Sequence, residues 1–163
     1  MKVAVAIVGY RNVADILACL DALSASTYDD FEVIICENGG KAAYEDLQRS
    51  LPSTLKGGQM LRAVMARKNL GFAGGVNVCL SETPDAEAWW ILNPDTQPAA
   101  GALGAKVRRL AKGDCDAVGC IIHLPIGKVQ SYGGRWSPIL GRSKALGRGA
   151  DPFAAVDACW VER

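Results

Sequence analysis

Short runs of residues typical of buried strands alternate with segments of helical periodicity, and this alternation restricts the fold more than any other feature. The first run, residues 3–8, is rich in valine and isoleucine and has no polar face. That pattern is typical of a strand covered on both sides. Strand-like and helix-like segments then alternate along the chain, as in α/β proteins. We therefore predict a mostly parallel sheet with helices on both faces.

The same pattern predicts where the individual elements lie. Strands are expected at 3–8, 31–36, 61–66, 88–92 and 116–122, and helices at 15–23, 41–51, 74–81 and 103–111. Beyond Leu124, glycine and proline recur so often that we expect loops, followed by a last short strand at 156–161. No internal repeat or linker divides the chain, so we predict one domain over residues 1–163 with a loop-rich C-terminal quarter.

Composition excludes several classes of protein. Eighteen Lys and Arg residues against 17 Asp and Glu give a net charge of +1, which provides no argument for nucleic-acid binding. The 50% hydrophobic content is too high for a disordered chain. No apolar run is long enough to span a membrane, so we expect a cytoplasmic protein.

The six cysteines point away from a zinc site. No pair has C-x-x-C spacing, and His123 is the single histidine of the sequence, so the usual finger-type ligand set is missing. Several cysteines lie in apolar runs, as Cys36 does. We therefore predict buried, reduced thiols that pack as small hydrophobic side chains.

The residues that follow each predicted strand are the candidates for ligand binding, because ligands of open parallel sheets bind at the carboxyl ends of the strands. No G-x-G-x-x-G follows the first strand and no G-x-x-x-x-G-K-[ST] occurs anywhere, which argues against nicotinamide enzymes and P-loop NTPases. Instead a carboxylate, a Gly/Asn loop and an aspartate follow successive strands. Each has a plain alternative as a turn or a helix cap. The segments are 9–12, 37–40, 69–77 and 93–96.

This ordered set resembles the nucleotide-sugar-binding half of glycosyltransferase family two, the GT-A fold, especially its rhamnosyltransferase-like members. The most specific match is Asn69-x-Gly71-Phe72-x-Gly74-x-x-Asn77, which is similar to the family's stretch beside the nucleoside. The resemblance is good from residue 2 to about 95 and looser to 163.

The resemblance also implies roles for single residues. Tyr10 and Asn12 would lie at the nucleobase, and Glu37 stands where the family has an aspartate that hydrogen-bonds the pyrimidine ring. Asn93-Pro94-Asp95 matches the Asn-Pro-Asp form of the D-x-D motif. Asp95 would then be the ligand of a Mg²⁺ or Mn²⁺ ion on the donor diphosphate, with Asn93 replacing the first acid.

The activity implied is inverting transfer from a nucleotide-diphosphate sugar, dTDP- or UDP-linked, to a glycan or lipid-linked acceptor. The family's general base lies in a Glu-Asp motif beyond the D-x-D region, and we assign no residue to it here. From this we expect a donor-binding part that ends before the acceptor segment and has weak or no transfer activity alone. A non-catalytic nucleotide-sugar-binding module or a degenerate subunit is the alternative. Peripheral association of the full enzyme with the inner face of the membrane is compatible with such an acceptor.

Overall fold

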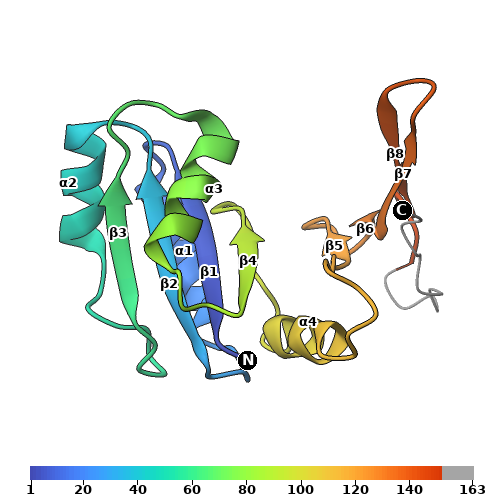
Figure 1. Ribbon diagram of the computed structural model, residues 1–163, viewed down its shortest axis with the longest axis horizontal. Coiled ribbons are helices and arrows are strands. Elements are labelled where there is room, and N and C mark those ends of the chain that lie inside the picture. The colour runs from blue at the N-terminus through green and yellow to red at the C-terminus, as the bar shows by residue number, and fades with distance from the viewer. Residues whose placement is uncertain (152–163) are drawn as a thin grey trace. The chain divides into compact units, whose positions relative to one another are not determined.

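The computed structural model describes residues 1–151 of the chain and separates into two compact units, Met1–Val107 and Arg108–Arg163. The first unit contains a four-stranded sheet with strand order β3-β2-β1-β4, in which every neighbouring pair is parallel (Figure 1). Its strands are β1 (Val3–Gly9), β2 (Phe31–Glu37), β3 (Leu61–Met65) and β4 (Ala88–Leu92).

Helices cover both faces of this sheet, as the sequence predicts. Figure 1 shows α3 in front of β1 and β2, and α1 behind them. Side chains from α1, α2 and α4 pack with one face of the strands, while Cys79 of α3 packs with the other face. The helices are α1 (Val13–Leu23), α2 (Lys41–Ser50), α3 (Gly71–Glu82) and α4 (Ala102–Leu110).

The alternation of side chains along β1 explains why its sequence has no polar face. Val5 and Ile7 point into the larger core with α1, whereas Ala6 points into the smaller core beneath α3. All three side chains are fully buried. The small alanines on the α3 side allow that helix to approach the sheet closely.

The second unit has two antiparallel hairpins within residues 108–151. The first pairs β5 (Ile122–His123) with β6 (Val129–Ser131), and the second pairs β7 (Gly133–Ser137) with β8 (Arg142–Leu146). The loop-rich description holds, because these strands are short and separated by turns.

The predicted strand at 116–122 is wrong. Only Ile122 of that run lies in a strand, and it pairs with β6 instead of the parallel sheet. An apolar run forms a buried strand only where other elements cover it, and here Ile121 and Ile122 stay exposed. The strand predicted at 156–161 lies outside the described residues.

Three of the five cysteines in the described part of the chain confirm the prediction of buried thiols. Cys19, Cys36 and Cys79 are buried, while Cys115 is partly exposed and Cys120 is exposed, and none of these five is in a disulfide. In residues 1–151 we find no helix with the length and apolar character that crossing a membrane requires.

The buried thiols give the folding free energy a predicted pH dependence. Burial is the main cause that raises the pKa of Cys79 to about 12 and that of Cys19 to about 11, from an ordinary value of 9.0. As the pH rises above 9, the unfolded chain therefore loses these protons before the folded chain does. The free energy of unfolding should fall by about 1 kcal/mol per thiol by pH 10.

Chemical denaturation at pH 7, 9 and 10 measures this dependence. The variant Cys79→Ala removes one thiol, so its stability should fall less steeply between pH 9 and 10 than that of the parent. If the free energy of unfolding depended on pH identically in the two proteins, the raised pKa of the Cys79 thiol would not be the cause of the loss of stability.

Candidate functional site

The register of the sheet brings the ends of its strands to one edge. Gly9 of β1 lies beside Glu37 of β2, and Glu37 lies beside Met65 of β3. Leu92, the last residue of β4, lies beside Ile7. The four segments singled out by the sequence therefore all leave the sheet at its carboxyl edge, toward which the arrowheads of Figure 1 point.

The first of these segments is held in an unusual backbone conformation. Arg11 has φ +57°, in the left-handed region that non-glycine residues rarely adopt. The Tyr10 N–H donates to Oδ1 of Asn12 at 2.9 Å, and the Arg11 N–H donates to Oε1 of Glu37 at 3.1 Å. Both bonds hold the turn, so the conformation is fixed by side chains that the sequence predicts to be functional.

Glu37 joins the first segment to the second. Its side chain is 0% exposed, and Oε1 also accepts the Gly39 N–H at 2.6 Å. A Cβ atom added at Gly9 would lie 2.7 Å from Oε2, and one added at Gly39 would lie 2.6 Å from Oε1. The two glycines therefore provide the space in which this carboxylate is buried. Within residues 1–151, Oε2 has no hydrogen-bond partner.

Asn38 joins the second segment to the third. Its backbone N–H donates to the carbonyl of Gly9 at 2.9 Å. Its side chain, in a residue only 5% exposed, donates to the carbonyl of Gly71 at 3.0 Å and accepts the Leu70 N–H at 3.3 Å. Three strand-end loops are thus connected by buried polar groups, which favours a preformed site.

The Gly/Asn segment forms the start of α3, three residues earlier than predicted. Oδ1 of Asn69 accepts a hydrogen bond from the backbone N–H of Gly71. Gly71 has φ +68°, a conformation that glycine adopts at little energetic cost. Phe72 is 54% exposed and Tyr10 is 52% exposed, so two aromatic rings are available to a ligand at this edge. Gly74 is partly buried and Asn77 is exposed on the second turn of the helix.

The fourth segment carries the predicted metal ligand. Asn93 and Asp95 are both exposed after β4, and Thr96 closes the turn by donating through its hydroxyl to the Asn93 carbonyl at 2.6 Å. The segment lies beside α1, because the thiol of Cys19 donates to the Asn93 carbonyl at 3.9 Å.

The donor set around Asp95 fits a cation that takes most of its ligands from elsewhere. Residues 1–151 contain no group of three or more His, Cys, Asp or Glu side chains arranged to hold a metal ion. Magnesium in phosphate-binding sites is typically held by one or two carboxylates together with substrate phosphates and water. A single exposed carboxylate is compatible with that mode and incompatible with an all-protein cage.

Two residues at this edge were not predicted as site residues, Arg11 and Asn38. Besides its backbone bond, Arg11 donates through Nε to the Gly39 carbonyl at 3.2 Å, and its guanidinium carbon lies 5.3 Å from the centroid of the Tyr10 ring. For Asn38, the sequence offered one indication, because the pair Asn38-Gly39 is typical of turns. Arg11 lies in the predicted segment 9–12, but no pattern assigned it a role of its own.

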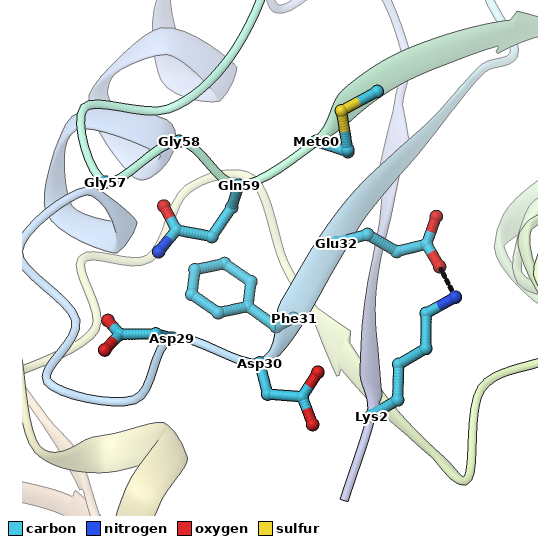
Figure 2. Close-up of a pocket in the computed structure, with 9 residues that line it drawn as sticks. All are labelled: Lys2, Asp29, Asp30, Phe31, Glu32, Gly57, Gly58, Gln59 and Met60. Atoms are coloured by element: carbon cyan, nitrogen blue, oxygen red, sulfur yellow. Dashed lines mark ion pairs between the residues drawn. The ribbon is translucent and has the colours of Figure 1, made fainter.

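A different pocket, of about 310 Å³, lies at the opposite, amino end of the strands (Figure 2). It is bordered by the start of β2 and by the turn before β3, and Lys2 pairs with Glu32 there at 3.1 Å. None of the predicted site residues lines it. Ligand binding at this pocket can therefore be distinguished from binding at the carboxyl edge of the sheet.

Solved structures with the same arrangement are glycosyltransferases. S. aureus TarS matches with a TM-score of 0.54 and 17% sequence identity, and the match covers 69% of this chain and 33% of the TarS chain. A TarS complex with UDP-GlcNAc matches similarly, with a TM-score of 0.53. The mannosyltransferase PcManGT from Pyrobaculum calidifontis, in complex with GDP-Man and Mn²⁺, matches with a TM-score of 0.59 and 21% identity over 77% of this chain and 36% of its own. The chain therefore spans about a third of the length of these structures.

The fold is thus of the GT-A type, as predicted. The sequence profile of glycosyl transferase family 2 matches residues 4–161. The chain belongs to this family, which confirms the resemblance found in the sequence. No curated protein matches it in sequence.

Proposed function

We propose that this chain binds the nucleotide-sugar donor of an inverting glycosyltransferase. The observation that carries the proposal is the convergence of four strand-end segments at one edge of the sheet, three of them joined by the buried side chains of Glu37 and Asn38. Membership of glycosyl transferase family 2 supports the reaction class. The proposed donor-binding residues are Tyr10, Asn12, Glu37, Asn69, Gly71, Phe72, Gly74, Asn77, Asn93 and Asp95.

The exposed groups at this edge suit the parts of a nucleotide-diphosphate sugar. The rings of Tyr10 and Phe72 offer flat apolar surface to a base or a ribose. The exposed amide of Asn77 offers both donors and an acceptor to hydroxyl groups, and the partly exposed amide of Asn12, whose oxygen holds the Tyr10 N–H, offers its NH₂ donors. We propose a dTDP- or UDP-linked sugar as donor and a glycan or lipid-linked saccharide as acceptor.

Asp95 is the residue that would hold Mg²⁺ or Mn²⁺. Such an ion, when bound with the donor, offsets negative charge on the diphosphate leaving group. The exposed carboxylate of Asp95 leaves the remaining coordination positions open to phosphate oxygens and water. Mn²⁺ is present in the similar structure of PcManGT, which supports a divalent cation at a GT-A site.

Thermal unfolding with UDP, dTDP, GDP or NAD, each with and without Mn²⁺, tests the proposal. A ligand present at one hundred times its dissociation constant stabilises the folded state by about 2.7 kcal/mol. For a chain of this size the midpoint should then rise by roughly 5–10 °C. We expect that rise with a nucleoside diphosphate and Mn²⁺. A rise with NAD alone, or none with any nucleoside diphosphate, would contradict the proposal.

A further inference from the structure

The side chain of Arg11 in the first loop is held in place while some of its donor groups remain free. Its backbone N–H, its Nε and the face of its guanidinium are engaged by Glu37, Gly39 and Tyr10. No hydrogen bond from Nη1 or Nη2 to another residue is found within residues 1–151. The N–H groups of two neighbouring nitrogens thus remain available in a defined orientation.

The backbone of Arg11 indicates that its side chain matters. Glycine would adopt φ +57° without strain, whereas arginine does so at a cost. Strained residues of this kind concentrate at functional sites. Here the strained conformation is maintained by Glu37, a completely buried carboxylate that accepts the backbone N–H of Arg11.

An open groove adjoins Arg11 on the side of α1 and α2. Its volume is about 770 Å³, and Arg11, Asn12 and Gly39 form its polar end. The walls are mainly small or apolar side chains, which suit a flat ring, and Asp46 of α2, which pairs with Arg49 at 3.4 Å, also borders the groove. The small or apolar wall residues are Val13, Ala14 and Leu17 of α1 and Ala42 and Ala43 of α2.

We propose that Arg11 determines which nucleobase the site accepts, by donating hydrogen bonds from its guanidinium to a carbonyl edge of the base, and that Glu37 is the positioning residue that holds Arg11. This inference rests on the proposed donor-binding function. A guanidinium has donors only. It therefore pairs with the carbonyl oxygens of uracil, thymine or guanine and opposes the exocyclic amino groups of cytosine and adenine.

Two pairs of nucleotides isolate this chemistry. UDP and CDP differ in a carbonyl against an amino group at C4 of the pyrimidine, and GDP and ADP differ in the same way at C6 of the purine, where guanine also carries an amino group at C2. Titration calorimetry with Mg²⁺ should show that the parent binds the carbonyl member of at least one pair about tenfold more tightly or better, a ratio typical of a good base contact by arginine. Equal affinities within both pairs would overturn the inference.

Variants of Arg11 and Glu37 test the assignment to these residues. Arg11→Gly relieves the left-handed backbone and should fold well, yet its carbonyl-to-amino ratio should fall close to one. Arg11→Lys keeps the charge without the planar fork, so most of the ratio should also be lost. Glu37→Gln should lower the ratio if Glu37 positions Arg11. The matched control is Arg62→Ala, an exposed arginine of β3 that pairs with Glu82 outside the groove, which should keep the parental ratio.

Pyrophosphate with Mg²⁺ separates a base contact from a phosphate contact. We expect Arg11→Gly to bind pyrophosphate as the parent does. If pyrophosphate affinity falls as much as the affinity for the carbonyl nucleotide, Arg11 binds phosphate and the inference fails. If the parent binds no nucleoside diphosphate at all, the proposed function fails and this inference fails with it. If it binds them and Arg11→Gly leaves the ratio unchanged, only the role of Arg11 is rejected.

Discussion

Asp95→Asn is expected to remove the dependence of donor binding on a divalent cation and to lower sugar transfer by the complete enzyme about a hundredfold or more. The reason is that a bound ion stabilises charge on the diphosphate by several kcal/mol, and Asp95 supplies the one carboxylate of the Asn93-Pro94-Asp95 segment. The affinity for UDP or dTDP should be measured at increasing Mn²⁺ concentration for parent and variant.

The folding of this variant should be normal, since Asp95 is exposed and exposed substitutions usually change stability by less than about 0.5 kcal/mol. Asp85→Asn is a matched control, because Asp85 is also exposed and precedes β4. The reverse change, Asn93→Asp, adds a second carboxylate and should strengthen Mn²⁺ binding. An unchanged Mn²⁺ dependence in Asp95→Asn would show that the ion, if it binds, is held elsewhere.

Gly75→Leu should produce the largest loss of stability, about 3 kcal/mol, at the upper end of the range for an overpacked core. Gly75 is buried in α3 where the helix approaches β1, and a Cβ atom there would lie 2.6 Å from Cγ1 of Val8. It would also lie 3.0 Å from Nδ2 of Asn38. The substitution should therefore disturb the amide that connects two loops of the site, and nucleotide affinity should fall together with stability.

Thermal and chemical unfolding measure the stability of this variant. A loss of that size should lower the midpoint by roughly 6–12 °C for a chain of this length. Gly101→Ala is the control, because an added Cβ at Gly101 meets no atom within 4 Å. If Gly75→Leu were as stable as the parent, the close approach of α3 to β1 would be incorrect.

The first unit could be predicted from the sequence because its signals are local. Residues 3–8 carry buried side chains on both faces, and the segment at 15–23 has its apolar residues at helical spacing. The run at 116–122 has a similar apolar composition, yet it lacks the neighbours that would bury it. The composition of a segment indicates that it can form a buried strand. Whether it does so depends on whether other strands and helices pack against it.

The position of the candidate site could be predicted from the sequence, but the hydrogen bonds that join its loops could not. The strand-end rule placed Asn69, Asn93 and Asp95 at one edge of a parallel sheet. The sequence could not show that Glu37 is completely buried, because this depends on the space left by glycines in two different loops. For the same reason the sequence, which placed Arg11 in a candidate segment, 9–12, did not show that its left-handed backbone is held by that carboxylate.

The most direct test of the account is where a nucleoside diphosphate binds. Amide chemical shifts of the ¹⁵N-labelled chain, recorded during titration with UDP or dTDP and Mg²⁺, locate the ligand on the fold. We predict that the shifts that change gather at 9–12, 37–40, 69–77 and 93–96, the carboxyl edge of the sheet. Changes confined to 29–32 and 57–60, around the pocket at the amino end (Figure 2), would contradict the account.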